Sequence, residues 1–430
     1  MSRVSRPRIL FLSYGFPRPG SGIGMRTLTF LRALSRFSDV TFVYRAPEDL
    51  TADERTPLKE FCKESVPIPV ASFDWVRPIY RLLDSRLKIL KLIPLLISKQ
   101  PIYIHSNILA KNRSEPLRAY LKTIKWDDFD LVHAGRLFMS DAIMDFLPAM
   151  KRAGVATVLD LDDIESEAVD RALTLSSNSR PKTWMGRFLM KLDLRRLRRY
   201  EKRSIPSFDA CVVCSGVDRE KVARNGLSSH PWVIANGVDT GYFKPEPKTS
   251  DRGRDILFLG NMSFPPNVDA VRFFAREVFP MISKKVPSSR FIIAGKKPVE
   301  SVLSLANGTD IVVTGEIPDL RPTYAHSALM VVPIRYGGGT RVKILEAMAM
   351  GKAVVSTSIG AEGIPAKDGR EIVIADRAGD LADQCIRLLD APELREALGQ
   401  RSREFVVKNF DRDLVEARIQ NVYRSLIKDD

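Results

Sequence analysis

Two cations and a carboxylate follow a run of glycines at spacings that suit a phosphorylated ligand. The residues concerned are Gly337, Gly338, Gly339, Arg341, Lys343 and Glu346. Consecutive glycines let the backbone turn tightly with its N–H groups exposed, and free N–H groups at the start of a helix attract anions. Lys343 and Glu346 are three residues apart and therefore share one helix face, where Lys343 can meet a phosphate and Glu346 a neutral diol such as a ribose. With Arg341 as a second cation, the pattern favours a nucleoside diphosphate over a lone phosphate.

The elements around these glycines read as strand, loop, helix and strand. Ala328–Val332 is a short apolar run that suits a buried parallel strand, and Ala353–Ser356 is a second one. Between them the sequence predicts a helix over Thr340–Met350, with Thr340 as its N-cap and Gly351 at its end. An ordinary turn with charged residues at the surface has the same pattern, so this alternative to a phosphate site stays open.

The chain opens with a similar order of elements. Arg8–Tyr14 reads as a buried strand, a helix is predicted from about Arg26 to Phe37, and a strand follows over Val40–Tyr44. A βαβ opening is typical of a doubly wound domain. The glycine-rich loop before the helix lacks the third glycine of the dinucleotide fingerprint, and the second strand ends in Arg45 without an acidic residue. The sequence therefore argues against a dinucleotide site.

Polar side chains follow two further predicted strands of this region. One predicted strand ends with Leu131–His133. A second ends with Thr157–Leu161, which includes Asp160, and Asp162 follows it directly. The carboxyl ends of strands in a doubly wound sheet face the ligand crevice. His133 can serve a ligand there or be a structural histidine, and the two aspartates can begin a turn and a helix or touch an acceptor substrate.

A compositional break suggests two domains. Lys244–Asp255 is charged, rich in proline and free of apolar residues, as linkers are. The sequence predicts an N-terminal domain over 1–248, a C-terminal domain over 249–408 and a C-terminal helical segment over 409–430. The elements predicted for the second domain are strands at Ile256–Gly260, Arg290–Ala294 and Ile311–Val313, and a helix at Asn267–Phe279. The fold class is therefore α/β with two doubly wound domains.

Composition narrows the class of protein further. The 430 residues are 44% hydrophobic and carry a formal net charge of +15, which lies mostly before residue 250. Four cysteines do not make a disulfide framework and fit a reducing compartment. Cys211 and Cys214 form a CxxC inside an apolar run, where we expect buried side chains and not redox or zinc chemistry. No run of 18 apolar residues is present, so no membrane span is predicted.

The segment 182–203 is the most basic part of the chain. It holds nine Lys and Arg against two acidic residues. Its apolar residues approximate one helical stripe: Met185, Phe188, Leu189, Leu192 and Leu197. This composition fits a helix on an anionic membrane surface, and it equally fits an ordinary amphipathic helix with a solvated basic face.

Three segments of the chain resemble a known family. GGGTRVKILEAMAMGKAVVSTSIGAEGI (337–364), NGVD (Asn236–Asp239) and FLGNMSFPPNVDAVRFF (Phe258–Phe274) are similar to segments of retaining, GT-B-fold glycosyltransferases of family 4. The likeness is strongest over residues 208–364 and extends to bacterial enzymes of exopolysaccharide and cell-surface sugars. It implies two Rossmann-like domains that face each other across a cleft, with the last helix returning to the first domain.

The resemblance also implies a reaction and its residues. A sugar would pass from a UDP- or GDP-linked donor to a glycan or lipid-linked acceptor without a metal or a cofactor, in the cytoplasm or at the inner face of the cell membrane. His133, Arg341 and Lys343 would be catalytic, and Asp160 and Asp162 would lie on the acceptor side. The donor would be held by Gly22, Gly24, Gly260, Asn261, Ile317, Arg335, Gly337, Gly338, Gly339, Thr340 and Glu346.

The sequence departs from the family pattern at three positions. The first of two glutamates spaced eight apart is replaced by Gly338, and a cation pair in the second domain is replaced by Asn261 and Asn267. We therefore expect Arg341 and Lys343 to take over the phosphate, helped by Arg335. A sugar-nucleotide epimerase and a catalytically silent, membrane-associated assembly subunit remain alternatives. No nucleic-acid partner is expected, because the basic residues lack a known module or aromatic stacking partners.

Overall fold

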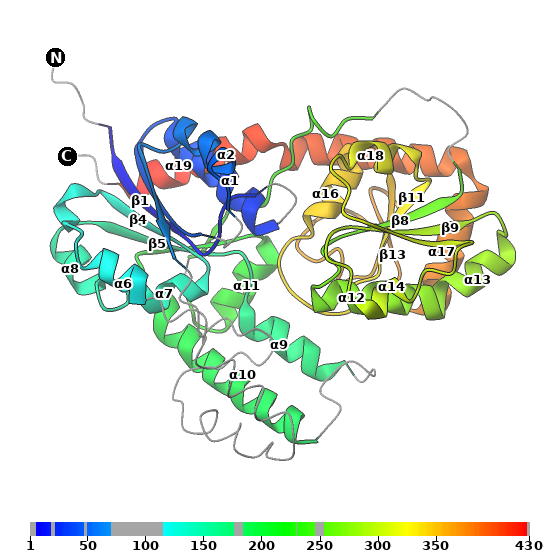
Figure 1. The fold of residues 1–430 in the computed structure, drawn as a ribbon, viewed down its shortest axis with the longest axis horizontal. Coiled ribbons are helices and arrows are strands. Elements are labelled where there is room, and N and C mark those ends of the chain that lie inside the picture. The colour runs from blue at the N-terminus through cyan, green and yellow to red at the C-terminus, as the bar shows by residue number, and fades with distance from the viewer. Residues whose placement is uncertain are drawn as a thin grey trace. The chain divides into compact units, whose positions relative to one another are not determined.

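The computed structural model describes residues 6–18, 22–46, 50–69, 115–175, 184–228, 230–245 and 253–427, with side chains described from Met190 onward in the helix that begins at Trp184. The chain forms two compact units (Figure 1). The first unit comprises Met1–Ile234 and Glu416–Asp430, and the second comprises Ala235–Val415. Each contains one parallel sheet with helices on both faces, as continuous apolar strands require.

The sheet of the first unit has the strand order β3-β2-β1-β4-β5-β6-β7. The strands are β1 (Arg8–Ser13), β2 (Asp39–Arg45), β3 (Glu64–Ile68), β4 (Leu131–Gly135), β5 (Ala156–Leu161), β6 (Ala210–Val213) and β7 (Trp232–Val233). All described pairings are parallel, and Phe11 of β1 lies in register with Phe42 of β2 and His133 of β4. The order turns at β1 and β4, where a doubly wound sheet opens its ligand crevice.

Helices cover both faces of this sheet. They are α1 (Gly22–Ser35), α2 (Ala52–Arg55), α6 (Glu115–Leu121), α7 (Leu137–Ile143), α8 (Leu147–Arg152), α9 (Glu165–Thr174), α10 (Trp184–Ser204), α11 (Gly216–Arg224) and α19 (Arg412–Leu426). Figure 1 shows α1 and α19 on one side of β1 and β4, and α7 and α8 on the other. The C-terminal helix thus supplies part of the cover of the N-terminal sheet.

The sheet of the second unit has the order β10-β9-β8-β11-β12-β13. Its strands are β8 (Asp255–Leu259), β9 (Arg290–Ala294), β10 (Ile311–Gly315), β11 (Leu329–Val332), β12 (Ala353–Ser356) and β13 (Val373–Ile374). Its helices are α12 (Pro265–Phe273), α13 (Phe279–Lys285), α14 (Glu300–Leu303), α15 (Arg321–His326), α16 (Val342–Ala349), α17 (Ala378–Asp390) and α18 (Pro392–Phe410). In Figure 1, α16 and α18 lie on one side of the strands, and α12 and α13 lie on the other.

The predicted helix over Asn267–Phe279 lies within one helical run, Pro265–Lys285, but the run is not α-helical throughout. It consists of α12, a π-helical turn over Phe274–Val278, and α13. Pro280 at the start of α13 has no N–H to bond the preceding turn, and the Phe279 N–H donates to the carbonyl of Phe274, five residues back. The wider turn absorbs the missing donor without ending the helix.

The change of unit does not coincide with the compositional break at 248. The first unit ends at Ile234, and residues 235–245 belong to the second. Val238 pairs with Asp411 in an isolated bridge, and Phe243 lies in the hydrophobic core of the second unit. Hydrophobic packing thus draws residues 235–243, which precede the predicted linker, into the second unit. At the other end, the second unit reaches Val415, beyond the predicted 408, and the first unit resumes at Glu416.

Candidate functional site

The glycine loop of the second unit connects β11 to α16. Gly337 (φ 109°) and Gly339 (φ 72°) adopt left-handed backbone conformations, whereas Gly338 does not. These dihedral angles strain residues with a side chain. A Cβ added at Gly337 would lie 3.2 Å from Arg341 Nη2 and 3.3 Å from Pro266. The two outer glycines therefore serve the geometry of the loop.

Arg341 closes this loop and begins the helix. Its Nη1 donates to the carbonyl oxygens of Gly338 and, at 2.7 Å, Gly339. The prediction that Thr340 caps α16 is wrong, because Arg341 is the N-cap residue and no side chain makes a capping hydrogen bond. Thr340 stands one residue before the cap, and its buried hydroxyl has no hydrogen-bond partner among the described residues. The predicted end at Gly351 fits, since that residue has φ 66° directly after the C-cap, Met350.

Lys343 points from the first turn of α16 toward β8. Its Nζ donates to Asn267 Oδ1 at 2.9 Å and lies 4.2 Å from the centre of the Phe258 ring. Burial, with the nearby Arg341, lowers the pKa of Lys343 to about 7, while Glu346 opposes the shift. The side-chain amine is therefore only partly protonated near neutral pH when the site holds no anion. A bound phosphate would supply the missing counter-charge.

Glu346 lies one turn further along α16. Its carboxylate accepts a hydrogen bond of 2.9 Å from the Tyr324 hydroxyl. Burial raises the pKa of Glu346, and Tyr324 and Lys343 oppose that rise. The carboxylate thus stands beside Lys343 with one hydrogen bond made, and it can accept another from a diol. Tyr324 was not predicted as a site residue, because nothing in the sequence around it indicates that its hydroxyl reaches α16.

The other predicted donor residues of the second unit take mainly structural contacts. Arg335 makes a bidentate ion pair with Asp269 at 2.9 and 2.7 Å, so its charge is neutralised within the protein. Asn261 Oδ1 accepts hydrogen bonds from the backbone and hydroxyl of Ser263, which shapes the turn after β8. Ile317 is half-buried against the core of the second unit.

Gly260 leaves the space in which the Lys343 ammonium lies. A Cβ at this position would be 2.8 Å from Lys343 Nζ and 2.6 Å from Asn267 Nδ2. The Gly260 backbone is not left-handed, so alanine fits the main chain. If the loop holds the UDP or GDP moiety that the family resemblance implies, Gly260→Ala should fold but bind that nucleotide about tenfold more weakly, equivalent to about 1.4 kcal/mol, because the added Cβ displaces the ammonium.

Calorimetric titration measures the nucleotide affinity of Gly260→Ala, and a thermal melt shows separately whether the variant is folded. Gly308→Ala is a control for added side-chain volume, because a Cβ there meets no atom within 4 Å, although its φ of 75° adds local strain. Unchanged affinity in Gly260→Ala would show that the Lys343 position is not essential for binding.

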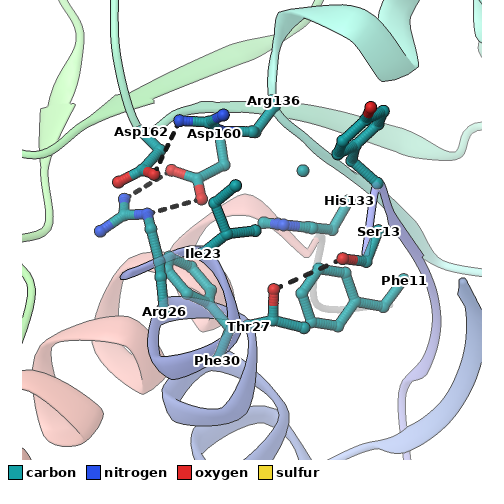
Figure 2. Close-up of a pocket in the computed structure, with 12 residues that line it drawn as sticks. Phe11, Ser13, Ile23, Arg26, Thr27, Phe30, His133, Arg136, Asp160 and Asp162 are labelled. Atoms are coloured by element: carbon teal, nitrogen blue, oxygen red, sulfur yellow. Dashed lines mark hydrogen bonds and ion pairs between the residues drawn. The ribbon is translucent and has the colours of Figure 1, made fainter. Parts of the chain in front are cut away.

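The first unit contains a pocket at the carboxyl ends of β1, β4 and β5, with about 300 Å³ of space that includes its open mouth. Figure 2 shows His133, Asp160 and Asp162 among its lining residues, together with Arg26 and Arg136. The structure therefore brings together the three polar residues that were predicted at these strand ends. The predicted Gly22 and Gly24 lie near the same edge, in the first turn of α1, where Gly22 is exposed and Gly24 is buried.

Both aspartates of this pocket form ion pairs. Arg26 donates to Asp160 through Nε (2.8 Å) and Nη2 (2.5 Å), and both side chains are at most 5% exposed. Arg136 Nη2 donates to Asp162 at 3.0 Å. Cys214 is buried beside Asp162, as the apolar CxxC run predicts, and burial raises the pKa of its thiol. The paired charges leave the pocket wall polar but without an isolated charge among these four side chains.

His133 is buried, with 1% of its surface exposed. Its Nδ1 lies 2.5 Å from the hydroxyl of Tyr423, and its Nε2 has no hydrogen-bond partner among the described residues. Burial, with the positive charge of Arg26, holds the pKa of His133 well below its usual value. The imidazole is therefore neutral at physiological pH.

The described part of α10 exposes its basic face and buries its apolar one. Leu194 and Leu197 pack in the core of the first unit, whereas Lys191, Arg195 and Arg199 are exposed. The predicted apolar stripe is thus turned inward at Leu197, and Leu192 is only half-buried. Met185, Phe188 and Leu189 of that stripe lie outside the described side chains. Within the described parts of the chain, no helix is long and apolar enough to cross a membrane, and no cluster of three or more His, Cys, Asp and Glu could hold a metal ion.

Comparison with known proteins bears on both units. Residues 253–391 match the family described as Glycosyl transferases group 1. Across 97% of this chain and 100% of the other, the structure resembles HepE from Anabaena in complex with UDP and glucose, with 14% identity and a TM-score of 0.62. The fold is GT-B. The two Rossmann-like units are thus those of a GT-B protein, and the glycine loop lies in the matched C-terminal part.

Curated relatives match about half of this GT-B chain. An uncharacterised protein in the cps region of Klebsiella pneumoniae is 26% identical over 223 residues, which are 50% of this chain and 56% of the relative. The lipopolysaccharide core biosynthesis mannosyltransferase LpcC of Rhizobium leguminosarum bv. viciae is 27% identical over 252 residues, which are 55% of this chain and 70% of the relative.

Proposed function

We propose that the protein is a glycosyltransferase that moves a sugar from a nucleoside diphosphate sugar to a glycan or lipid-linked acceptor, as a retaining enzyme of family 4. The observation that carries this proposal is the placement of Lys343. Its ammonium lies beside Gly260 and Asn267, next to a helix N-terminus and the guanidinium of Arg341. At this glycine loop, a bound anion would stabilise the charged form of a part-buried lysine whose pKa is lowered to about 7.

The proposed reaction needs such a site for its leaving group. As the bond between sugar and phosphate breaks, negative charge accumulates on the β-phosphate, and preorganised cations stabilise it. Arg341 and Lys343 supply two cations at the start of α16, and Glu346 would hold the ribose. No metal is required for this charge balance. We propose that the donor sugar binds next to His133 and that the acceptor binds beside Asp160 and Asp162. The ion pairs of these aspartates with Arg26 and Arg136 hold that wall of the pocket in place.

Binding of the donor diphosphate is expected to take up a proton at Lys343. The free site has a pKa of about 7, and a phosphate beside the ammonium raises that pKa. Affinity should therefore fall as pH rises above 7, by up to tenfold per pH unit. Calorimetry at pH 8 in two buffers of different ionisation enthalpy measures the uptake, and Lys343→Arg should abolish it. Equal apparent enthalpies in both buffers for the wild-type protein would contradict the assignment.

The nucleotide of the donor can be identified by titrating the protein with candidate nucleotides. HepE contains UDP and glucose in its solved complex, and LpcC is named as a mannosyltransferase; we therefore propose UDP- and GDP-linked hexoses as the donors to test. Purified protein is titrated with UDP, GDP and NAD, each with and without EDTA. We expect UDP or GDP to bind equally in EDTA, NAD not to bind, and Lys343→Ala to weaken the bound nucleotide. Failure of both nucleotides to bind would overturn the proposed function.

We further propose that the acceptor belongs to cell-surface polysaccharide synthesis and is reached at the inner face of the cell membrane. The names of the Klebsiella and Rhizobium relatives support the first part. The exposed basic face of α10 supports the second, through electrostatic attraction to anionic lipid and not through an inserted apolar face. The epimerase and silent-subunit alternatives receive no support from these relatives.

A further inference from the structure

His133 and Tyr423 form a buried hydrogen-bonded pair across 290 positions of the sequence. His133 belongs to β4, and Tyr423 comes from α19. Both side chains are essentially inaccessible to solvent. Phe11 contacts the imidazole edge-on with ring centroids 4.1 Å apart, and Phe30 lies 5.1 Å away. The aromatic cage holds the ring in one plane, and Figure 2 shows it at the pocket beside Phe11 and Phe30.

The proton positions of this pair follow from its burial. Burial raises the pKa of Tyr423 well above its usual value, so its hydroxyl keeps its proton. Among the described residues, His133 Nδ1 is the hydrogen-bond partner of that hydroxyl. A neutral imidazole has one donor and one acceptor nitrogen. If Nδ1 carried the proton, the tyrosine O–H would lie buried without an acceptor, which is unfavourable. The O–H therefore donates to Nδ1, and the imidazole proton resides on Nε2.

Protonation of the second nitrogen is opposed by the surroundings. Arg26 and its partner Asp160 line the pocket with His133, and the positive charge of Arg26 adds to burial in lowering the pKa of His133. A second cation would be placed next to the first inside a buried pocket. Nε2 is thus a neutral donor and cannot act as a general base.

The charges and hydroxyl groups that line the pocket determine which ligand group can accept a hydrogen bond from His133 Nε2–H. The cations Arg26 and Arg136 are paired with Asp160 and Asp162. Ser13 and Thr27 add hydroxyl groups to the lining, 3.4 Å apart. A phosphate would find no uncompensated charge among these side chains, whereas an uncharged hydroxyl oxygen could accept from Nε2–H.

We propose that Tyr423 is a positioning residue that fixes His133 as the Nε2–H tautomer, so that a neutral N–H meets a hydroxyl oxygen of the sugar substrate. The identity of the ligand as a sugar rests on the proposed function, but the tautomer does not. Tyr423 touches neither substrate nor reacting atoms in this assignment. Its effect passes through the imidazole alone.

The tautomer is measured by long-range ¹H–¹⁵N spectra of the full-length protein with ¹⁵N-labelled histidine rings. The chain has four histidines, and His133→Asn identifies the signal of interest. We expect a single Nε2–H pattern that does not change between pH 6 and pH 8. In Tyr423→Phe the pattern should become a mixture of tautomers or begin to titrate. An Nδ1–H pattern in the wild-type protein, or an unchanged pattern in Tyr423→Phe, would overturn the proposal.

A comparison of nucleotide-sugar binding (UDP-glucose, GDP-mannose) with free-nucleotide binding (UDP, GDP) tests whether the Nε2–H of His133 donates to the sugar. Tyr423→Phe should lower the affinity of the nucleotide sugar that binds by about tenfold, with the free nucleotide unaffected. Tyr200→Phe is the matched control, because it removes a hydrogen bond of 2.7 Å to Ser140 elsewhere in the first unit. Equal loss in both variants, or loss for the free nucleotide too, would overturn the positioning role. If neither nucleotide sugar nor nucleotide binds the wild-type protein, the proposed function and the sugar assignment fail, while the spectra still decide the tautomer.

Discussion

Lys343→Met is expected to lower kcat for sugar transfer about 10²–10³-fold, the loss found when one preorganised oxyanion donor is removed. The part-buried ammonium follows the glycine loop, donates to Asn267 of α12 and lies over the Phe258 ring of β8. Its stabilisation grows as charge moves onto the leaving diphosphate, so KM should change less than kcat. Initial rates with the donor identified by titration measure the effect. Lys284→Met, at an exposed lysine of α13 in the same unit, is the matched control.

Loss of activity through unfolding can be excluded, because Lys343→Met is expected to stabilise the ligand-free protein while it lowers kcat. The folded-state pKa of Lys343, about 7, lies below its ordinary 10.5. The ammonium therefore destabilises the ligand-free protein fully below pH 7, and that penalty disappears as pH rises from 7 to 10.5. Lys343→Met should raise the melting temperature at pH 6 and leave it nearly unchanged at pH 10. Wild-type activity in Lys343→Met would show that the glycine loop is only a structural turn. It would also favour the alternative of a catalytically silent assembly subunit.

Asp160→Asn is expected to reduce the free energy of unfolding by about 3–5 kcal/mol, as breaking a buried ion pair does. The substitution leaves the guanidinium of Arg26 buried beside β5 without the carboxylate that accepts two of its hydrogen bonds. The pair is also the wall of the pocket in the first unit, so the variant should bind nucleotide sugar more weakly. Urea denaturation followed by circular dichroism measures the loss.

The surface pair of Asp170 and Arg198 supplies the control for this measurement. Its side chains are 43% and 47% exposed, and Asp170→Asn should change stability by no more than about 1 kcal/mol. The double variant Arg26→Met/Asp160→Leu removes both charges and should recover most of the stability lost in Asp160→Asn. Equal effects of Asp160→Asn and Asp170→Asn would show that the buried pair contributes no more than a surface one.

Strands were the most predictable elements of this protein. Arg290–Ala294 and Ala353–Ser356 have the same bounds in the structure as in the sequence-based prediction. Each is a mostly apolar run, interrupted only by Arg290 at the start of the first and Ser356 at the end of the second, and a largely buried parallel strand needs no more than that. Helix details were less predictable. The π-helical turn after Phe273 and the uncapped start of α16 depend on how a proline and a cation are accommodated in three dimensions.

The sequence by itself determined the α/β class with two parallel sheets, the glycine loop, and the helix face shared by Lys343 and Glu346, because spacing and apolar pattern are local properties. Only the tertiary structure decided the state of each charge. Lys343 meets Asn267, Asp160 meets Arg26, and His133 meets Tyr423, across 76, 134 and 290 positions. Burial and a partner from a distant segment set the pKa of an ionisable group, and neither can be read from the residues beside it.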